Sequence, residues 1–343
     1  MKKLKWGILG TGNIASVMAC ALNNTPDSEL IGVASRNLDS AKKFANEYQV
    51  PKYYGNYDHL IEDASVDIVY IALPHSLHAN WAIKIANAKK HILCEKPCAI
   101  NYDSAKKVIE AVKVNNVFFM EALMYRCHPQ TKLLADILRQ GVIGDVRLIE
   151  ASFSYLGQEV GIENQVISYL GGGAILDVGC YPISMASLIV KAMGGVEVPF
   201  EIQCMAQINP RTRVDDWAIA QVNYGSGILA KLTAGRMLEH KNDLRIFGSK
   251  GSLCVPSPWV PGGRSAGVTN IFLKKNGVKT EEIIQVVSTT GLYELEVNVV
   301  HQNIENKQSQ EVPWSDTLEN IKFLQKWRNL TGSKEVDDVG CID

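Results

Sequence analysis

Residues 4–15 read LKWGILGTGNIA, an apolar stretch that runs through a glycine-rich turn into a second apolar segment. The turn has the pattern G-x-G-x-x-A, in which Gly10 permits a tight turn and Gly12 lets a pyrophosphate approach the backbone. The small Ala15 lets the following helix pack closely on the strand, and the start of that helix offers N–H groups and partial positive charge to phosphates. The stretch therefore predicts a strand, a turn and a helix that bind a dinucleotide; a glycine-rich turn without a ligand is the alternative.

Strands and helices are expected to alternate through the N-terminal third of the chain. The segment 67–73 is mostly apolar, as expected for a strand that is buried on both faces of a parallel sheet. Strict alternation favours a doubly wound parallel sheet with right-handed crossovers, so we expect an α/β fold whose dinucleotide-binding Rossmann domain spans residues 1–122. Its expected strands are 4–10, 30–35, 67–73, 91–94 and 117–120, and its expected helices are 14–24, 38–48, 76–89 and 103–115.

After residue 122 a run of strands separated by short turns replaces the alternation. Gly225-Ser226-Gly227 is typical of a hairpin turn, and the Pro- and Gly-rich stretch 256–267, which contains Trp259, is expected to be a mobile loop. The run predicts an α+β domain with an open, mostly antiparallel sheet at residues 123–343, whose last helix can pack back on the first domain. Expected strands are 146–155, 201–208, 218–224, 228–234, 243–247, 271–275 and 282–287, and expected helices are 131–140, 173–193, 292–305 and 317–330.

Composition narrows the class of protein further. The 343 residues are enough for two domains, and the net charge of −1 excludes a uniformly basic surface for nucleic acid. The eight cysteines form no C-x-x-C pair and no zinc-type spacing with histidine, which predicts free thiols, no metal site and a cytoplasmic location. No apolar run approaches the roughly 18 residues of a membrane span, and glycines interrupt the N-terminal stretch that imitates a signal peptide. We therefore expect no membrane partner.

The end of the second strand predicts which dinucleotide is bound. An NAD-binding protein is expected to carry an acidic residue there for the ribose 2′-hydroxyl, but this chain has Ser35 and Arg36. A hydroxyl and a guanidinium suit a 2′-phosphate, so NADP(H) is preferred and NAD(H) stays possible. Alternatively, Arg36 stacks on the adenine or caps the next helix, and Asp39 holds the ribose.

Glu95-Lys96-Pro97 directly follows an expected strand. Ligands of doubly wound sheets bind beyond the carboxyl ends of the strands, so we expect Lys96 to point into that crevice. A cationic nicotinamide would lower the pKa of Lys96, which suits proton transfer or the binding of a substrate oxygen, and Pro97 stiffens the turn. A solvated charge is the alternative.

A second candidate segment begins with three glycines at 171–173 and continues to Asp177 and Tyr181. These two residues are four apart, so in a helix both project from one face. A carboxylate and a phenol on one face can bind a sugar hydroxyl and relay its proton. The alternative is a carboxylate favoured by the helix dipole and a tyrosine packed in the core.

Further candidates lie around the expected domain junction, where ligand pockets form. Arg126 can face a hydroxylated substrate or a cofactor phosphate, whereas His128 can equally be a structural turn residue. His75 and His78 follow the expected strand 67–73, and we expect them to shape the pocket or cap the next helix rather than bind a metal.

These motifs occur in a fixed order: Gly10–Ala15, Ala72–His75 with His78, His91–Pro97, Met120–Arg126 and Gly171–Tyr181. Together they resemble the glucose-fructose oxidoreductase, inositol dehydrogenase and rhizopine-catabolism (GFO/IDH/MocA) family of oxidoreductases. The resemblance in order and spacing runs from residue 5 to about residue 190, and the later strands fit the family's architecture with little motif content.

The resemblance implies that Lys96 is the catalytic lysine and Asp177 the substrate-binding carboxylate. Many members have histidine where this chain has Tyr181, which argues against an inositol dehydrogenase. Tyrosine there is similar to the branch with dihydrodiol dehydrogenases, xylose dehydrogenases and glucose-fructose oxidoreductase, and it implies Tyr181 as acid/base, with its proton affinity lowered by Lys96. The resemblance also implies a homodimer or homotetramer formed through the exposed face of the second domain's sheet.

The sequence thus predicts an NADP(H)-dependent oxidoreductase acting on a sugar, a cyclic polyol or diol, or a related carbonyl. A non-catalytic NADP(H)-sensing module on the same fold is the alternative, and an imine or tetrapyrrole reductase is a third reading. The substrate is expected to contact Lys96, Arg126, Asp177 and Tyr181. Residues expected to bind the cofactor are Gly10, Thr11, Gly12, Asn13, Ile14, Ser35, Arg36, Leu73, Pro74, His75, Glu95, Lys96 and Arg126.

Overall fold

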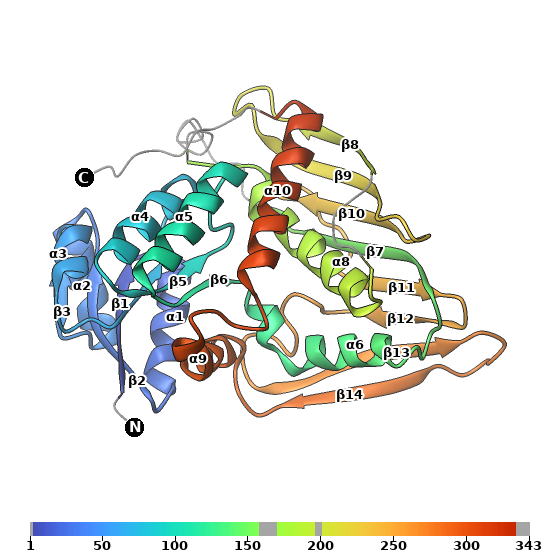
Figure 1. Cartoon of the computed structure of the whole chain (residues 1–343), viewed down its shortest axis with the longest axis horizontal. Coiled ribbons are helices and arrows are strands. Elements are labelled where there is room, and N and C mark those ends of the chain that lie inside the picture. The colour runs from blue at the N-terminus through green and yellow to red at the C-terminus, as the bar shows by residue number, and fades with distance from the viewer. Residues whose placement is uncertain (1–2, 158–169, 196–200, 334–343) are drawn as a thin grey trace. The chain divides into compact units, whose positions relative to one another are not determined.

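The computed structural model describes residues 3–157, 170–195 and 201–333, which divide into two units (Figure 1). The first unit comprises the chain up to Met124 together with the returning segment Tyr293–Leu318. The second comprises Tyr125–Leu292 and, among the described residues after Leu318, residues 319–333.

Six parallel strands form the sheet of the first unit, in the order β3-β2-β1-β4-β5-β6. The order reverses between β1 and β4, the kind of switch point at which open α/β sheets bind ligands. The doubly wound parallel sheet is therefore confirmed. Sequence periodicity missed β3, which has only three residues, none of them fully buried. The strands are β1 Leu4–Leu9, β2 Ser28–Ala34, β3 Lys52–Tyr54, β4 Ile68–Ile71, β5 His91–Glu95 and β6 Phe119–Ala122.

The helices of this unit mostly begin at asparagine caps. Side chains of Asn37, Asn56 and Asn101 accept backbone N–H groups at the starts of α2, α3 and α5, which satisfies donors that a helix leaves open. Helices α1 and α4 differ, because their caps, Gly12 and Pro74, make no side-chain hydrogen bond to the first N–H groups. The helices are α1 Asn13–Asn24, α2 Leu38–Tyr48, α3 Tyr57–Glu62, α4 His75–Asn87 and α5 Tyr102–Asn115.

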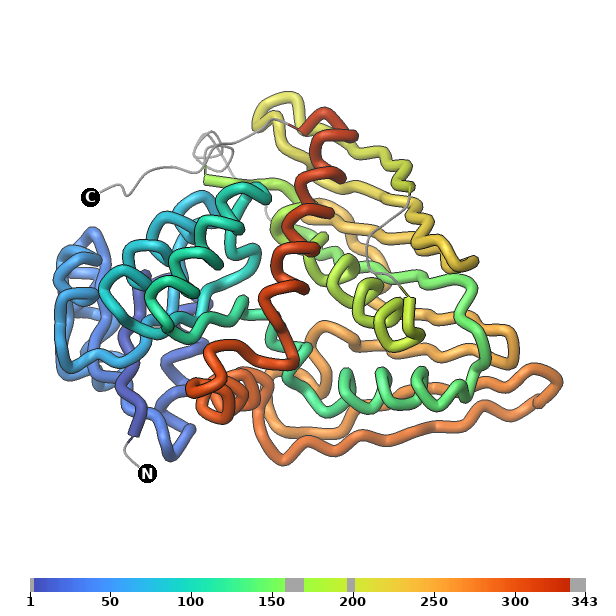
Figure 2. Tube along the Cα trace, in the orientation of Figure 1, coloured from blue at the N-terminus to red at the C-terminus, as the bar shows by residue number. Residues whose placement is uncertain are grey.

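The chain returns to the first unit through α9 (Leu292–Asn303), the 3-10 turn η3 (Ile304–Asn306) and the start of α10 (Trp314–Thr331), a path that can be followed in Figure 2. This segment covers the outer edge of β6. The Phe119 N–H donates to the Lys307 carbonyl at 3.0 Å, and the Phe119 carbonyl accepts from Trp314 Nε1 at 3.0 Å.

Eight strands form the sheet of the second unit, in the order β14-β13-β12-β11-β7-β10-β9-β8. Every pair is antiparallel except β7 and β10, which run parallel. The open, mostly antiparallel sheet is confirmed, and so is the hairpin turn at 225–227, which joins β9 to β10. The strands are β7 Val146–Ser154, β8 Glu201–Ile208, β9 Asp215–Asn223, β10 Leu229–Gly235, β11 Leu244–Gly248, β12 Gly251–Val255, β13 Gly267–Lys275 and β14 Glu282–Ser288.

Helices cover one face of this sheet. After the 3-10 turn η1 (Met124–Cys127), α6 (Pro129–Arg139) packs on β13 and β14, and α8 (Cys180–Ala192) packs on β7 and β10 (Figure 1). The stretch Ile175–Ala192 is long and apolar enough by length and composition to cross a membrane, but 72% of it is buried in the fold, as in a core helix. The criterion of an uninterrupted apolar run does not find this stretch in the sequence, because charged and proline residues interrupt it.

The loop between β12 and β13 is ordered around Trp259. The side chain of Trp259 is 2% exposed, and its Nε1 donates to the Ser152 carbonyl at 2.8 Å. The burial of Trp259 does not fit mobility at this residue, whereas the mobility of the rest of the loop stays a prediction. A single buried aromatic anchors a stretch that its proline and glycine content marks as irregular.

Candidate functional site

The glycine turn after β1 fits the phosphates of a dinucleotide. Gly10 has φ +102°, and a Cβ there would lie 2.3 Å from the Ala72 carbonyl oxygen, so no other residue fits. A Cβ at Gly12 would instead meet nothing within 4 Å. Because no side chain caps α1 and its first turn holds no acidic residue, its first N–H groups are available to an anion. Thr11, Asn13 and Ile14 flank this opening and are partly or fully exposed.

The end of β2 presents Arg36 to solvent. Ser35 is turned back to the chain, since its Oγ accepts the Asn37 N–H at 3.3 Å. Asn37, not Arg36, caps α2, which removes one of the alternative roles for Arg36. Burial raises the pKa of Tyr57, and the hydrogen bond and charge of Arg36 oppose that rise. Asp39 lies in the exposed first turn of α2.

A buried histidine joins the turns that follow β4 and β5. His78 Nε2 lies 2.6 Å from the Leu73 carbonyl oxygen, and Nδ1 lies 2.8 Å from that of Pro97. Burial lowers the pKa of His78, and the charge of Lys96 adds to this. A neutral imidazole has a single N–H, so it donates to one of these carbonyls at a time. His75 is the first residue of α4, with its ring 5.8 Å from that of His78.

Pro74, which the sequence assigns to the cofactor site, is the N-cap of α4. Residues 73–75 therefore all lie at the carboxyl end of β4.

Glu95 holds the backbone at Lys96. Its Oε1 accepts the Tyr70 hydroxyl at 2.5 Å, and its Oε2 accepts the Lys96 N–H at 3.2 Å. The Lys96–Pro97 bond is cis, and Lys96 is half-buried. Because β1, β4 and β5 are neighbours, the first unit brings the glycine turn, the turn at 73–75 and Lys96 to one edge of the sheet.

Two further acids lie in the core behind this edge, and the sequence assigned a role to neither, although Glu121 belongs to the motif Met120–Arg126. Glu121 is buried and accepts the Cys98 N–H at 3.0 Å. Glu296 of α9 is fully buried, and within the described part of the chain neither of its oxygens has a hydrogen-bond partner. Burial, with the charge of Glu95, raises the pKa of Glu296 well above its ordinary value. Burial therefore disfavours the ionised form of this carboxyl.

In the second unit, the glycines at 171–173 leave room for the side chain of a buried aspartate. Gly173 has φ +111°, and a Cβ there would lie 2.5 Å from Asp215 Oδ1. Asp215 is 1% exposed and accepts the Ile175 N–H at 2.6 Å and the Ser333 hydroxyl at 3.0 Å. Asp215 thus anchors the start of the segment that carries Asp177.

The sequence predicted one regular helix for that segment, but the structure does not have one. Residues Ile175–Gly179 form a π turn, η2, and the α-helix α8 begins only at Cys180. A π turn closes i→i+5 hydrogen bonds and is wider than an α turn. Asp177 lies in this wide turn and Tyr181 in the first turn of α8, so the α-helical spacing used to relate them does not hold.

The parallel pairing of β7 and β10 places two unpredicted side chains beside Asp177. Ser154 is in register with Gly235, so the next residues, Tyr155 and Arg236, leave the sheet together. The Tyr155 hydroxyl donates to Asp177 Oδ2 at 2.5 Å, and Arg236 Nε donates to the Tyr155 oxygen at 3.2 Å. Arg236 Nε also lies 3.6 Å from Asp177 Oδ2.

Electrostatics couple these three groups. Burial raises the pKa of Tyr155, and the charge and hydrogen bond of Asp177 raise it further. Burial lowers the pKa of Arg236, but Tyr155 and Asp177 outweigh burial and raise it overall. Tyr155 therefore stays protonated as a donor and Arg236 stays charged.

Aromatic rings surround Tyr181. Its own ring is 5% exposed, and the centroids of Phe153, Tyr125 and Trp259 lie 4.9, 5.7 and 5.9 Å away. Burial raises the pKa of Tyr125 to about 12. These aromatic residues lie apart in the sequence. The fold brings them into one cluster that fixes the Tyr181 ring.

Arg126 and His128 have structural contacts. Arg126 is 6% exposed, and its Nη1 donates to the Ser184 hydroxyl at 3.0 Å and to the Ser184 carbonyl at 3.3 Å, contacts that the sequence did not anticipate. His128 accepts the Gln130 N–H through Nδ1 and caps α6, which matches the structural alternative. Burial lowers the pKa of His128 to about 4.

The predicted residues thus gather in two sets. The first unit brings the glycine turn, the ends of β2 and β4 and Lys96 to its sheet edge, and the second unit holds Asp177, Tyr181 and Arg126. Across residues 3–157, 170–195 and 201–333, no three His, Cys, Asp or Glu side chains gather as metal ligands would.

Comparisons with known proteins show the family of the chain. Residues 4–123 match the family described as oxidoreductase family, NAD-binding Rossmann fold, and residues 131–254 match the GFO/IDH/MocA C-terminal domain. Trans-1,2-dihydrobenzene-1,2-diol dehydrogenase of Danio rerio is 32% identical over 281 residues, which cover 81% of this chain and 79% of that protein.

Two solved structures share the fold over nearly their whole length. KijD10, a 3-ketoreductase from Actinomadura kijaniata in complex with NADP and TDP-benzene, superposes with a TM-score of 0.86 at 26% identity, covering 98% of this chain and 99% of that one. Aldose-aldose oxidoreductase from Caulobacter crescentus superposes with a TM-score of 0.84 at 21% identity, covering 96% and 97%. The latter likeness is one of fold alone.

Proposed function

Since the chain belongs to the GFO/IDH/MocA family of NAD(P)-binding oxidoreductases, we propose that it transfers a hydride between NADP(H) and a sugar, a cyclic polyol or diol, or a related carbonyl. The observation that carries the proposal is Lys96, fixed by Glu95 at the sheet edge that also holds the open start of α1. A dinucleotide on α1 and a reacting group near Lys96 then share one edge.

The cofactor residues follow from this edge. The start of α1, with Gly10, Thr11, Gly12, Asn13 and Ile14, would hold the pyrophosphate. Ser35 and Arg36 would bind the 2′-phosphate, a role supported by the lack of an acid at the end of β2 and by the NADP in the KijD10 complex. When bound, NADP⁺ accepts a hydride on its nicotinamide. Residues assigned to the nicotinamide side are Leu73, Pro74, His75, Glu95, Lys96 and Arg126.

The proposed substrate residues are the four assigned from the sequence. Lys96, Asp177 and Tyr181 would contact the reacting group and its neighbouring hydroxyls, with Arg126 nearby. In oxidation, Tyr181 takes the hydroxyl proton, assisted by Lys96, while Asp177 accepts a hydrogen bond from a second hydroxyl. The aromatic surroundings of Tyr181 and the dihydrodiol dehydrogenase relative support a ring-shaped substrate.

The test is steady-state turnover followed by absorbance of the reduced cofactor, with trans-1,2-dihydrobenzene-1,2-diol, levoglucosan, D-xylose and D-glucose as probes. We expect turnover of at least one probe and a higher kcat/KM with NADP⁺ than with NAD⁺. Arg36→Ala removes charge-assisted bonds to the 2′-phosphate, so it should lower kcat/KM for NADP⁺ about tenfold or more and leave that for NAD⁺ nearly unchanged.

Lys106→Ala is the matched control, because Lys106 is an exposed cation of the same unit whose contacts are with Asp103 and Tyr102 of the same helix. An enzyme that turns over no probe with either cofactor, yet still binds NADPH, would contradict the proposal and favour the sensing module. Equal losses with NADP⁺ and NAD⁺ in Arg36→Ala would contradict the assignment of Arg36.

The cysteines support a cytoplasmic location, which is also part of the proposal. Cys20, Cys94, Cys98, Cys127, Cys180, Cys204 and Cys254 are all free thiols. Reducing compartments keep thiols in this state. We propose a small molecule as the partner in catalysis, and the net charge of −1 offers no attraction for nucleic acid or an anionic membrane.

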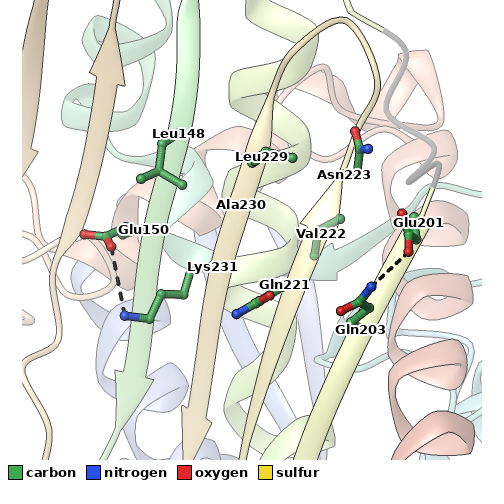
Figure 3. Close-up of a pocket in the computed structure, with 10 residues that line it drawn as sticks. All are labelled: Leu148, Glu150, Glu201, Gln203, Gln221, Val222, Asn223, Leu229, Ala230 and Lys231. Carbon is green, nitrogen blue, oxygen red and sulfur yellow. Dashed lines mark hydrogen bonds and ion pairs between the residues drawn. The ribbon is translucent and has the colours of Figure 1, made fainter.

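The uncovered face of the second sheet supports self-association as a homodimer or homotetramer. Phe247, Leu148 and Leu229 lie in register across three strands, and Leu229 is 51% exposed. The next row holds Glu150 and Lys231, which pair at 4.0 Å. Figure 3 shows Leu148, Leu229, Glu150 and Lys231 among the residues that line a hollow of about 340 Å³ on this face. Exposed apolar rows of this kind mark protein contacts.

Leu229→Arg tests this surface by sedimentation velocity. The native chain should sediment as a multiple of its 37.8 kDa mass, and the variant should associate at least about tenfold more weakly, because the contact would bury an unpaired guanidinium. Val114→Arg is the control, since Val114 is 75% exposed on α5 of the first unit. A native chain that sediments as a monomer would exclude the assembly.

A further inference from the structure

We propose that Tyr155 and Arg236 are positioning residues for Asp177, holding its carboxylate in a hydrogen-bonded chain for a substrate hydroxyl. The inference rests on the proposed function, because it assumes that Asp177 binds substrate. It adds two residues from the ends of β7 and β10 that no local motif marks.

The donor and acceptor groups of the three side chains set the direction of this hydrogen-bonded chain. Arg236 Nε can only donate, and the carboxylate of Asp177 can only accept. The Tyr155 oxygen, which accepts from Arg236 at 3.2 Å, therefore sends its single hydrogen to Asp177 at 2.5 Å. Successive bonds between a cation, a hydroxyl and an anion polarise one another, so each strengthens the next.

The backbone fixes where these side chains begin. The N–H of Tyr155 donates to the Gly235 carbonyl at 3.0 Å, and the N–H of Arg236 donates to the Asp216 carbonyl at 2.8 Å. The Arg236 carbonyl accepts the Gly157 N–H at 2.7 Å. The backbone of Arg236 is thus bonded through its N–H and its carbonyl, and that of Tyr155 through its N–H, which fixes the points from which both side chains leave.

The acceptor end is anchored independently. Asp215 is buried and binds the first N–H of the π turn, two residues before Asp177. The donor end of the hydrogen-bonded chain is therefore held by the strands β7 and β10, and the acceptor end is held by a buried aspartate of β9. Side chains held from both ends supply the preorganisation that a binding carboxylate needs.

Exposure sets the size of the expected effect. The side chains of Asp177 and Arg236 are 28% and 25% exposed, so water can replace part of a lost bond. Removal of one charge-assisted hydrogen bond should cost about tenfold in affinity. Because Asp177 would bind a non-reacting hydroxyl equally in the ground and transition states, the loss should fall on KM, with kcat changed less than about twofold.

The experiment is a double-variant cycle with trans-1,2-dihydrobenzene-1,2-diol and levoglucosan as probes at saturating NADP⁺. Tyr155→Phe and Arg236→Gln should each raise KM about tenfold, and the double variant should be no worse than about twice the more affected single variant, because both act through one chain. Arg236→Lys keeps a donor and a charge, so it should recover part of the loss. Tyr48→Phe is the matched control: its hydroxyl also donates to a carboxylate, that of Glu47, at 2.9 Å in the first unit.

Three outcomes would overturn the inference: unchanged KM in Tyr155→Phe, effects that multiply in the double variant, or a fall in kcat equal to the rise in KM. Thermal unfolding checks that each variant is folded, and Arg236→Lys replaces Arg236→Gln in the cycle if the latter does not fold. Normal activity of Tyr155→Phe beside an inactive Lys96→Ala would overturn only this inference. A native enzyme inactive on every probe overturns the proposed function, and this inference with it.

Discussion

Replacement of Lys96 by alanine should lower kcat about a thousandfold or more and change the dissociation constant of NADPH less than about threefold. The ammonium group is assigned to the reacting oxygen, and a positioned charge or proton donor there contributes two to four orders of magnitude. The backbone of Lys96 is held by Glu95, so loss of the side chain leaves the edge of the sheet intact. Turnover assays and tryptophan-fluorescence titration with NADPH measure the two quantities.

Lys107→Ala provides the comparison, since it removes an exposed lysine on α5 of the same unit. Near-native turnover of Lys96→Ala on a true substrate would show that the lysine is only a solvated charge. A large loss of NADPH affinity with little loss of kcat would instead limit Lys96 to binding the cofactor and remove its role at the reacting oxygen.

Tyr181→Phe should lower kcat about a hundredfold to ten-thousandfold with little change in KM. The substitution removes only the hydroxyl, and the ring keeps its neighbours Phe153, Tyr125 and Trp259. Thermal stability should therefore change little, and the loss should appear in the chemical step. Single-turnover measurements of the reduced cofactor separate that step from binding and release.

Tyr224→Phe serves as the control, because Tyr224 is another buried tyrosine of the second unit. It should leave turnover unchanged. If Tyr181→Phe kept native kcat, the proton would have to leave through another group, and the alternative of a tyrosine that only packs in the core would hold.

Local pattern predicted the parallel sheet well, because its central strands are buried on both faces and read as apolar runs. Strand β4 is buried at all four residues, and β5 at all but one. The short β3 and α3 escaped the prediction, since three to six residues carry too little periodicity. The π turn escaped it for another reason: its anchor, Asp215, lies 40 residues further along the chain.

The residues of the candidate site also divide into those that local sequence indicates and those that it does not. Gly10 and Lys96 directly follow strands and Arg36 lies two residues after one, so local sequence indicated their place at the sheet edge. Tyr155 and Arg236 also follow strands, but their meeting depends on the parallel pairing of β7 with β10, which short-range sequence does not encode. The burial of Glu296 likewise depends on the return of α9 to the first unit.

That return also sets an order of events during synthesis on the ribosome. Strand β6 is the outer strand of its sheet, and the partner of the Phe119 carbonyl, Trp314, is translated 195 residues later. An uncovered strand edge is prone to pair with other chains. The dinucleotide-binding unit, although its strands are translated first, cannot close this edge until all eight strands of the second sheet have been made.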